Sequence, residues 1–295
     1  MIGDRSTKVC AICALLAAWL AISDVPAHRD LDLQIADLTQ RIAAEPDNLQ
    51  LYMQRGELHR LHRDWKAAEA DYRRVHKLRP GLAVVDFLMG RMKLEAGRPK
   101  QARKLLDRFL AAEPDHAKAR VARARALVRL GEPLAAARDY SRAIDAHGEE
   151  HRPDPSYYVE RARALVSAGS EHIAAAVRGL DEGLERLGQP VALQLYAIDL
   201  ELMRGRHDAA LERLGRIASR ADRQETWLVR RGKILEDAGR PAEARDAYFA
   251  ALEAVRALPP SRQGTRAVRR LQARAEAALE RLDAAPSDEA SEPGP

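Results

Sequence analysis

Glycine recurs along this chain at nearly constant intervals. Five glycines are separated by 34, 38, 36 and 34 residues: Gly97, Gly131, Gly169, Gly205 and Gly239. A period near 34 is typical of helix–turn–helix units that stack side by side. The spacing therefore predicts an array of helical repeats and argues against a single globular core.

Proline follows three of these glycines at a fixed distance. The three segments are Gly97-Arg98-Pro99, Gly131-Glu132-Pro133 and Gly239-Arg240-Pro241. Glycine readily takes the left-handed backbone conformation that ends a helix. Proline suits the first turn of the next helix, because the missing N–H has no partner there. Each segment thus predicts a tight connection between two antiparallel helices.

The composition agrees with helices. Hydrophobic residues make up 46% of the chain, but aromatic residues only 4%. Alanine and leucine must therefore supply most of the core, and both have high helix propensity. A β-sandwich would need more β-branched and aromatic residues.

Small and large residues recur in phase with the glycines. Four repeats read Gly56, Ala68, Tyr72, Val75, Pro80; Gly90, Ala102, Leu106, Phe109, Pro114; Ala124, Ala136, Tyr140, Ala143; and Gly232, Ala244, Tyr248, Ala251. Two looser repeats read Ala162, Ala176, Leu180, Gly183 and Ile198, Ala210, Leu214, Ile217. This pattern resembles the tetratricopeptide repeat family over residues 47–258. The resemblance implies an all-α, right-handed superhelical solenoid of about six helix–turn–helix repeats with capping helices at both ends.

Both flanks of the repeats predict further helices. Residues 28–46 predict an N-terminal capping helix, whose helical part runs from Leu31 to Ala44. Residues 259–283 predict a C-terminal capping helix, with a long amphipathic stretch from Ser261 to Leu282. Residues 284–295 are rich in Ala, Pro, Ser, Asp and Glu and predict a disordered acidic tail.

The first 27 residues have the order of a secretory signal peptide. Arg5 and Lys8 precede an uncharged run, Val9 to Ile22, and Ala27 ends a small-residue cleavage motif. We expect export to a periplasm or secretion. The alternatives are an uncleaved membrane anchor or a buried first helix. Both cysteines, Cys10 and Cys13, lie in the apolar run, so the processed chain would have no disulfide and no cysteine-ligated zinc.

The sequence predicts neither an enzyme nor a cofactor or metal site. It has no phosphate-binding loop, nucleophile elbow or HExxH motif. His59 and His62 with Asp64, or an N-terminal His28, could be imagined as metal ligands, but solvated surface histidines are the simpler reading. An enzyme or metal carrier remains a remote alternative.

The basic charge leaves a second function open. The net charge is +5 and the isoelectric point about 9.3, which would suit an acidic glycan or nucleic acid. Arginines are interleaved with Asp and Glu along the chain, a distribution that does not favour nucleic acid.

The family resemblance also implies a binding site. In the family, positions 5 and 9 of each first helix face the concave groove. Position 5 is apolar, with Met53, Phe87, Val121, Val159, Leu195 and Val229; position 9 contains Arg91, Arg125 and Arg163 between Glu57, Asp199 and Lys233. We expect an exported scaffold or adaptor of an envelope complex that binds an unknown protein or peptide, with acidic groups or a free carboxylate held by arginine. The alternative is that the stripe is buried between helices and the arginines only confer solubility.

Overall fold

The computed structural model describes residues 25–148 and 152–284, and these residues form helices and connections without any strand. They fall into two compact units divided between Ala146 and His147. The expected signal peptide, apart from its last three residues, and the expected acidic tail after Ala284 lie outside the described residues. No helix within the described ranges is long and apolar enough to cross a membrane.

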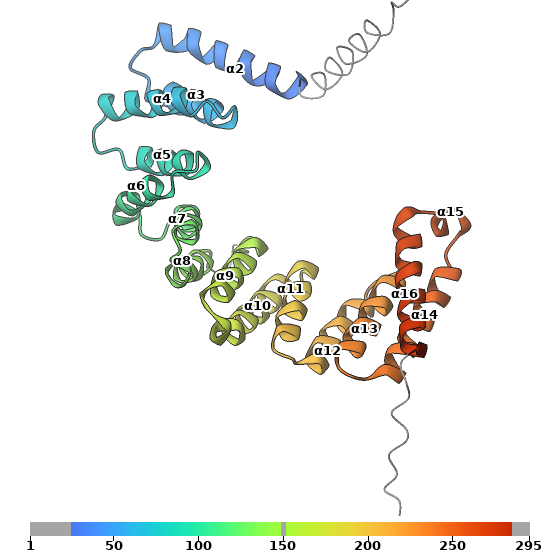
Figure 1. Cartoon of the computed structure of the whole chain (residues 1–295). Coiled ribbons are helices and arrows are strands. Elements are labelled where there is room, and N and C mark those ends of the chain that lie inside the picture. Colours follow the sequence, from blue (N-terminus) through green and yellow to red (C-terminus); the bar gives the residue numbers. More distant parts are fainter. Residues whose placement is uncertain (1–24, 149–151, 285–295) are drawn as a thin grey trace, which may run out of the picture. The chain divides into compact units, whose positions relative to one another are not determined.

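The first unit is one single helix followed by three antiparallel helix pairs (Figure 1). Its helices are α2 (Val25–Ala44), α3 (Leu49–Leu61), α4 (Trp65–Leu78), α5 (Val84–Glu95), α6 (Pro99–Ala112), α7 (Ala117–Arg129) and α8 (Pro133–Asp145). Within each pair, α3 packs on α4, α5 on α6, and α7 on α8. These pairs confirm the helical repeats predicted from the glycine spacing.

The second unit has three further helix pairs and ends in two more helices, of which the last packs against the pair before it. Its helices are α9 (Pro155–Ala168), the 3₁₀ turn η1 (Ser170–His172), α10 (Ile173–Leu187), α11 (Val191–Met203), α12 (His207–Ala218), α13 (Glu225–Asp237), α14 (Pro241–Arg256), α15 (Pro260–Gln263) and α16 (Arg266–Ala284). The turn η1 is the extra segment that lengthens the spacing around Gly169.

The connections have the predicted backbone geometry. The φ angles of Gly97 and Gly131 are 72° and 75°, in the left-handed region that favours glycine. Pro99 and Pro133 then begin α6 and α8. At the equivalent place in the first repeat stands Arg63, with a φ of 61°, so this position takes the same turn at a cost in backbone strain.

Small residues allow the paired helices to approach closely. A Cβ atom added to Gly56 would lie 2.6 Å from Cε1 of Tyr72, and one added to Gly90 would lie 2.8 Å from Cγ of Leu106. Ala68 and the other alanines at its repeat position are fully buried. The repeat phase predicted from the sequence is therefore confirmed by side-chain packing.

Both flanking helices differ from the sequence prediction in their bounds. Helix α2 begins at Val25, before the predicted Leu31. The predicted helix from Ser261 to Leu282 is broken into α15 and α16. Gly264 is a weak helix former, and the hydroxyl of Thr265 accepts a hydrogen bond from the N–H of Val268 at 3.4 Å, so a new helix begins there.

Candidate binding groove

The first unit has a groove of about 890 Å³ between α2, α3 and α5. We call it the N-terminal groove. It is lined by Leu33, Gln34, Asp37 and Leu38 of α2, by Gln50, Met53, Gln54, Glu57 and Leu58 of α3, and by Val84 and Leu88 of α5. Its volume is in the range of sites that bury much of a ligand's surface.

The wall formed by α2 exposes an apolar side chain. Leu33 is 66% exposed although it lines the groove. Helix α2 packs against α3, and no helix of the described residues pairs with α2 as α3 pairs with α4. An exposed leucine beside other apolar side chains is a mark of an interaction surface rather than of a finished core.

The floor of the groove is apolar and adaptable. Met53 and Leu58 come from α3, while Val84 and Leu88 come from α5; all four are half-buried. These side chains pack against the core that contains Leu38 and Leu51, so they are held in place from below. The unbranched side chain of Met53 can adjust to different partner shapes.

The rim of the groove is polar and carries carboxylates but no cationic side chain. Three glutamines, Gln34, Gln50 and Gln54, stand beside Asp37 and Glu57 in the lining. The side chain of Asp37 is largely exposed, and its nearest cation is Arg41, with an N–O distance of 3.8 Å. A surface pair of this kind contributes little, so Asp37 is available to a basic group.

Glu57 is held by three neighbours. The hydroxyl of Tyr72 donates a hydrogen bond of 2.7 Å to one carboxylate oxygen, Arg60 donates one of 3.1 Å to the other, and Arg91 lies 3.6 Å away. Burial raises the pKa of Glu57, but these contacts outweigh burial and hold the pKa below its usual value. Glu57 is therefore a fixed negative charge at the edge of the groove.

The structure separates the predicted site residues by exposure. Met53 lines the groove, but Phe87 and Val121 are only 7% and 3% exposed. The ring centroid of Phe87 lies 5.2 Å from that of Phe109 and 4.8 Å from that of His116. Phe87 and Val121 are thus packing residues in this conformation and offer little contact surface.

The predicted arginines occupy different surroundings. The guanidinium of Arg91 lies 5.4 Å from the ring centroid of Phe87, and that of Arg163 lies 5.7 Å from the ring centroid of Tyr196. Arg125 and Arg163 are exposed, and Val159 is half-buried. Arg91 and Arg125 belong to the first unit and Arg163 to the second, so a shared site for the three stays a prediction.

The sequence analysis did not predict that α2 lines the N-terminal groove, although the pattern of apolar residues in α2 indicates it. Leu31, Ile35, Leu38 and Ile42 follow helical spacing and predict one buried face. Leu33 falls outside that face, and an apolar residue there indicates a second contact surface.

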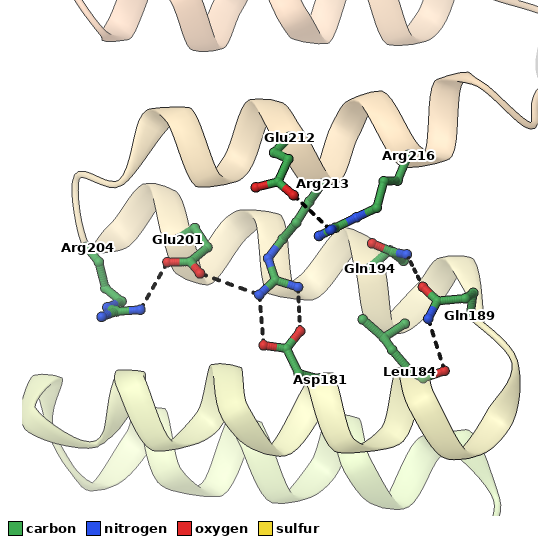
Figure 2. A network of polar contacts seen from close by, with 9 residues as sticks. All are labelled: Asp181, Leu184, Gln189, Gln194, Glu201, Arg204, Glu212, Arg213 and Arg216. Carbon is green, nitrogen blue, oxygen red and sulfur yellow. Dashed lines mark hydrogen bonds and ion pairs between the residues drawn. The ribbon is translucent and has the colours of Figure 1, made fainter.

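The second unit contains a buried charge network (Figure 2). Arg213 of α12 donates hydrogen bonds of 2.6 and 2.9 Å to Asp181 of α10 and lies 3.5 Å from Glu201 of α11. Arg204 also pairs with Glu201, at 3.0 Å. The charges of Arg213 and Glu201 are buried and mutually satisfied, which indicates a structural role.

The candidate histidines do not form a metal centre. His62 lies 3.7 Å from Asp32, and burial lowers the pKa of His59. Across the described residues, no group of three or more His, Cys, Asp or Glu side chains could hold a metal ion.

Two segments of the chain match the tetratricopeptide repeat family, at residues 87–151 and 197–262. The first segment falls within residues 47–258, the range that the sequence pattern assigned to the repeats, and the second extends beyond that range, to residue 262. No curated protein matches the chain.

Several solved structures share the fold at low sequence identity. The pilus biogenesis factor PilW is 17% identical, with a TM-score of 0.54 over 68% of this chain and 92% of that one. A tetratricopeptide repeat protein from Parabacteroides merdae is 16% identical, with a TM-score of 0.51 over 86% and 95%. The Naa15/Naa10 complex bound to HypK contains a chain 14% identical, with a TM-score of 0.53 over 86% and 37%. These likenesses bear on the fold alone.

Proposed function

We propose that this chain, a tetratricopeptide repeat protein, is an exported adaptor that binds a segment of a partner protein in the N-terminal groove. The observation that carries the proposal is the exposed Leu33 above a floor of Met53, Leu58, Val84 and Leu88. A half-exposed apolar surface of this size gains free energy when a partner covers it. The proposal involves no catalytic step.

The chemistry of the groove defines the partner segment. Apolar side chains on one face of a short amphipathic helix would fill the floor, as in other helix-in-groove interactions. The exposed carboxylate of Asp37 at the rim favours Lys or Arg beside that face. We therefore propose a basic amphipathic helix as the ligand of this groove.

A pair of designed peptides tests this proposal. One helical peptide has leucines on one face and lysines beside them, and its twin carries glutamates in place of the lysines. By fluorescence anisotropy with the chain that starts at His28, we expect the lysine peptide to bind at least tenfold more tightly. Equal binding of the two peptides would contradict the charge argument.

A matched pair of variants locates the site. Leu33→Ser removes an apolar side chain from the groove without adding a charge, whereas Leu61→Ser makes the same change at a leucine of α3 that is 55% exposed and does not line the groove. Losing a buried leucine contact is worth about 1.5–3 kcal/mol, so Leu33→Ser should weaken binding at least tenfold and Leu61→Ser less than twofold. Equal losses of affinity in the two variants would show that the peptide binds outside the N-terminal groove.

Export is supported by the order of charges and apolar residues in the first 27 residues. Cleavage after Ala27 would remove only three residues of α2 and leave all the lining residues in place. Intact-mass measurement of protein from the cell envelope should show a chain that starts at His28. A chain that keeps Met1 and stays in the cytosol would refute export. PilW is described as a pilus biogenesis factor, but a role in envelope assembly rests here on the export signal.

A second candidate is capture of an acidic segment by the predicted arginines of the first unit, Arg91 and Arg125. The observation in its favour is the exposure of Arg125 on the first helix of its repeat. Changing both arginines to Glu should abolish binding of a poly-glutamate peptide and leave the lysine peptide bound. Since binding of a polyanion falls steeply with salt, a salt titration separates this candidate from apolar binding in the groove.

A further inference from the structure

The end of the second unit concentrates positive charge on two helices. The stretch from Ala254 to Ala275 contains six arginines and no Asp or Glu. Five of these arginines belong to α15 and α16, and all five are exposed. We call them the arginine band: Arg262, Arg266, Arg269, Arg270 and Arg274. We propose that the arginine band binds the surface of a membrane that contains anionic lipids, an interaction that goes beyond the proposed function and does not involve the N-terminal groove.

The charges of the arginine band are not neutralised within the described part of the chain. None of the five guanidinium groups forms a hydrogen bond or an ion pair with another described residue. Elsewhere in the same unit, Arg213 and Arg240 each pair with a carboxylate. The N-terminus of α16 adds the partial positive charge of the helix dipole close to Arg266 and Arg269. The band therefore keeps its donors and its charge for an anionic ligand.

The packing of α16 turns the arginines outward. Arg266, Arg270 and Arg274 follow one another at intervals of four residues, so they project from one side of the helix. The opposite side packs against α14 and α13 (Figure 1) and carries the buried residues Val268, Ala275, Ala278 and Leu279. Ala273 and Ala277 are exposed beside the arginines. Because alanine is small, no bulky side chain at these two positions keeps a flat surface away from the guanidinium groups.

The chemistry of this side of α16 favours lipid headgroups over a protein or a nucleic acid. A protein interface usually has an apolar core, and proteins that bind single strands stack bases on aromatic rings; Ala273 and Ala277 supply neither. The planar guanidinium pairs well with phosphate. Four to eight basic residues on an amphipathic helix are typical of binding to anionic lipids. Since the apolar side of α16 is buried against α14, the helix lies on the headgroups and does not insert.

The charge distribution along the chain agrees with contact at one end. Over most of the sequence, arginines alternate with Asp and Glu, whereas the stretch from Ala254 to Ala275 has no acidic residue. A positive surface confined to one end suits contact with a membrane plane. Wrapping of a long polyanion would use a positive surface that continues along the repeats.

Cosedimentation with lipid vesicles tests the proposal. The chain that starts at His28 is used, because the apolar run before it would bind lipid by itself, and this chain keeps all five arginines. Each basic residue near an anionic surface raises the binding constant about fivefold. In about 0.1 M salt, we expect vesicles with about one-third phosphatidylglycerol to bind the chain at least about fiftyfold more tightly than pure phosphatidylcholine vesicles. About 0.5 M salt should remove most of this preference, because it screens the charges.

Three sets of substitutions locate the binding surface. Changing Arg266, Arg270 and Arg274 together to Gln should weaken binding to the anionic vesicles at least about thirtyfold, since three factors of about five are lost. Lysine at the same three positions keeps the charge and should keep the affinity within about threefold. The matched control makes the same change in net charge at three exposed arginines that have carboxylate partners, and it should weaken binding by less than about threefold. These control substitutions are Arg73→Gln, Arg108→Gln and Arg216→Gln.

Several results would overturn the proposal. They are equal binding to neutral and anionic vesicles, equal losses in the glutamine variant and its control, and a loss in the lysine variant as large as that in the glutamine variant. Tighter binding of a duplex DNA than of the anionic vesicles, at the same salt concentration, would assign the arginine band to nucleic acid and exclude the lipid ligand.

Peptide binding separates this proposal from the proposed function. The lysine peptide should bind the glutamine variant and the native chain equally, because the N-terminal groove lies in the other unit. If neither chain binds the peptide while vesicle binding still depends on the arginine band, only the proposed function fails. If both chains bind the peptide and neither binds anionic vesicles, only the lipid proposal fails.

Discussion

Replacing Gly90 by leucine tests the packing on which the repeats depend. Gly90 lies on α5, and a Cβ atom there would lie 2.8 Å from Cγ of Leu106 and 3.5 Å from the carbonyl oxygen of Ala102. Leu106 and Ala102 are fully buried, so neither can move aside without disturbing the next layer. The leucine side chain adds three more carbon atoms to this space.

The expected magnitude follows from two opposing terms. Overpacking a closed core costs about 1–3 kcal/mol, whereas leucine gains about 0.8 kcal/mol of helix propensity over glycine. We therefore expect Gly90→Leu to lower the free energy of unfolding by about 1–2 kcal/mol. Gly215 on α12 has nothing within 4 Å of an added Cβ, so Gly215→Leu should gain about 0.5–1 kcal/mol.

Urea unfolding followed by far-ultraviolet circular dichroism measures both variants. The slope of the transition must stay constant for the midpoints to report stability. Equal midpoints for Gly90→Leu and Gly215→Leu, with unchanged slopes, would show that the close approach at Gly90 is not needed. That result would refute the assigned phase of the repeats.

Three further variants, one of them with a matched control, test single features by the same assay. Arg63→Gly should raise the free energy of unfolding by about 1 kcal/mol, because glycine takes the left-handed conformation without strain; no gain would mean that the strain is relieved elsewhere. Arg213→Ala should lower the free energy of unfolding by about 3 kcal/mol, because buried Glu201 would keep only Arg204 as a partner and Asp181 would lose two hydrogen bonds. Arg216→Ala, which breaks an exposed pair, should change it by less than about 0.5 kcal/mol; similar losses would contradict the role of burial. Glu57→Gln should lower it by about 1–3 kcal/mol at pH 7. Since the contacts of Glu57 hold its folded pKa below the usual value, the stability it contributes is present above the unfolded pKa and is lost as pH falls through the folded pKa; a difference from the native chain that does not narrow as pH falls would contradict this assignment.

The repeats could be predicted because their signal is steric and local. Gly56 and Gly90 must be small to admit Tyr72 and Leu106, and a left-handed turn at Gly97 requires a positive φ. Such constraints act within one helix pair, so one sequence suffices to find them.

The candidate site could be predicted only in part, because it depends on contacts between repeats. The residues at position 5 of the repeats include Met53, which lines the groove. They also include Phe87, which is buried because its ring packs against Phe109 and His116. The contribution of α2 to the groove was not predicted, because Leu33 lies outside the helical face whose apolar spacing identifies the core.

Paired charges inside the repeats were also missed, although their spacing is regular. Arg55 donates to Asp71 and Arg123 to Asp139, each pair sixteen residues apart and at the same position in its repeat. A search for recurring opposite charges at one separation would have found them. Both pairs use two guanidinium nitrogens, which fixes the angle of the side chains.

The contacts of Arg213 with Asp181 and Glu201 have a consequence for how the second unit comes apart. If α12 melted while α10 and α11 stayed folded, Asp181 and Glu201 would both lose Arg213, and Glu201 would keep only Arg204. A boundary between ordered and melted helices at this place therefore has a free-energy penalty. In a linear array, penalties at such boundaries determine how many neighbouring units melt together. Amide protons of α10, α11 and α12 should accordingly exchange with solvent in one concerted opening event, with a common rate.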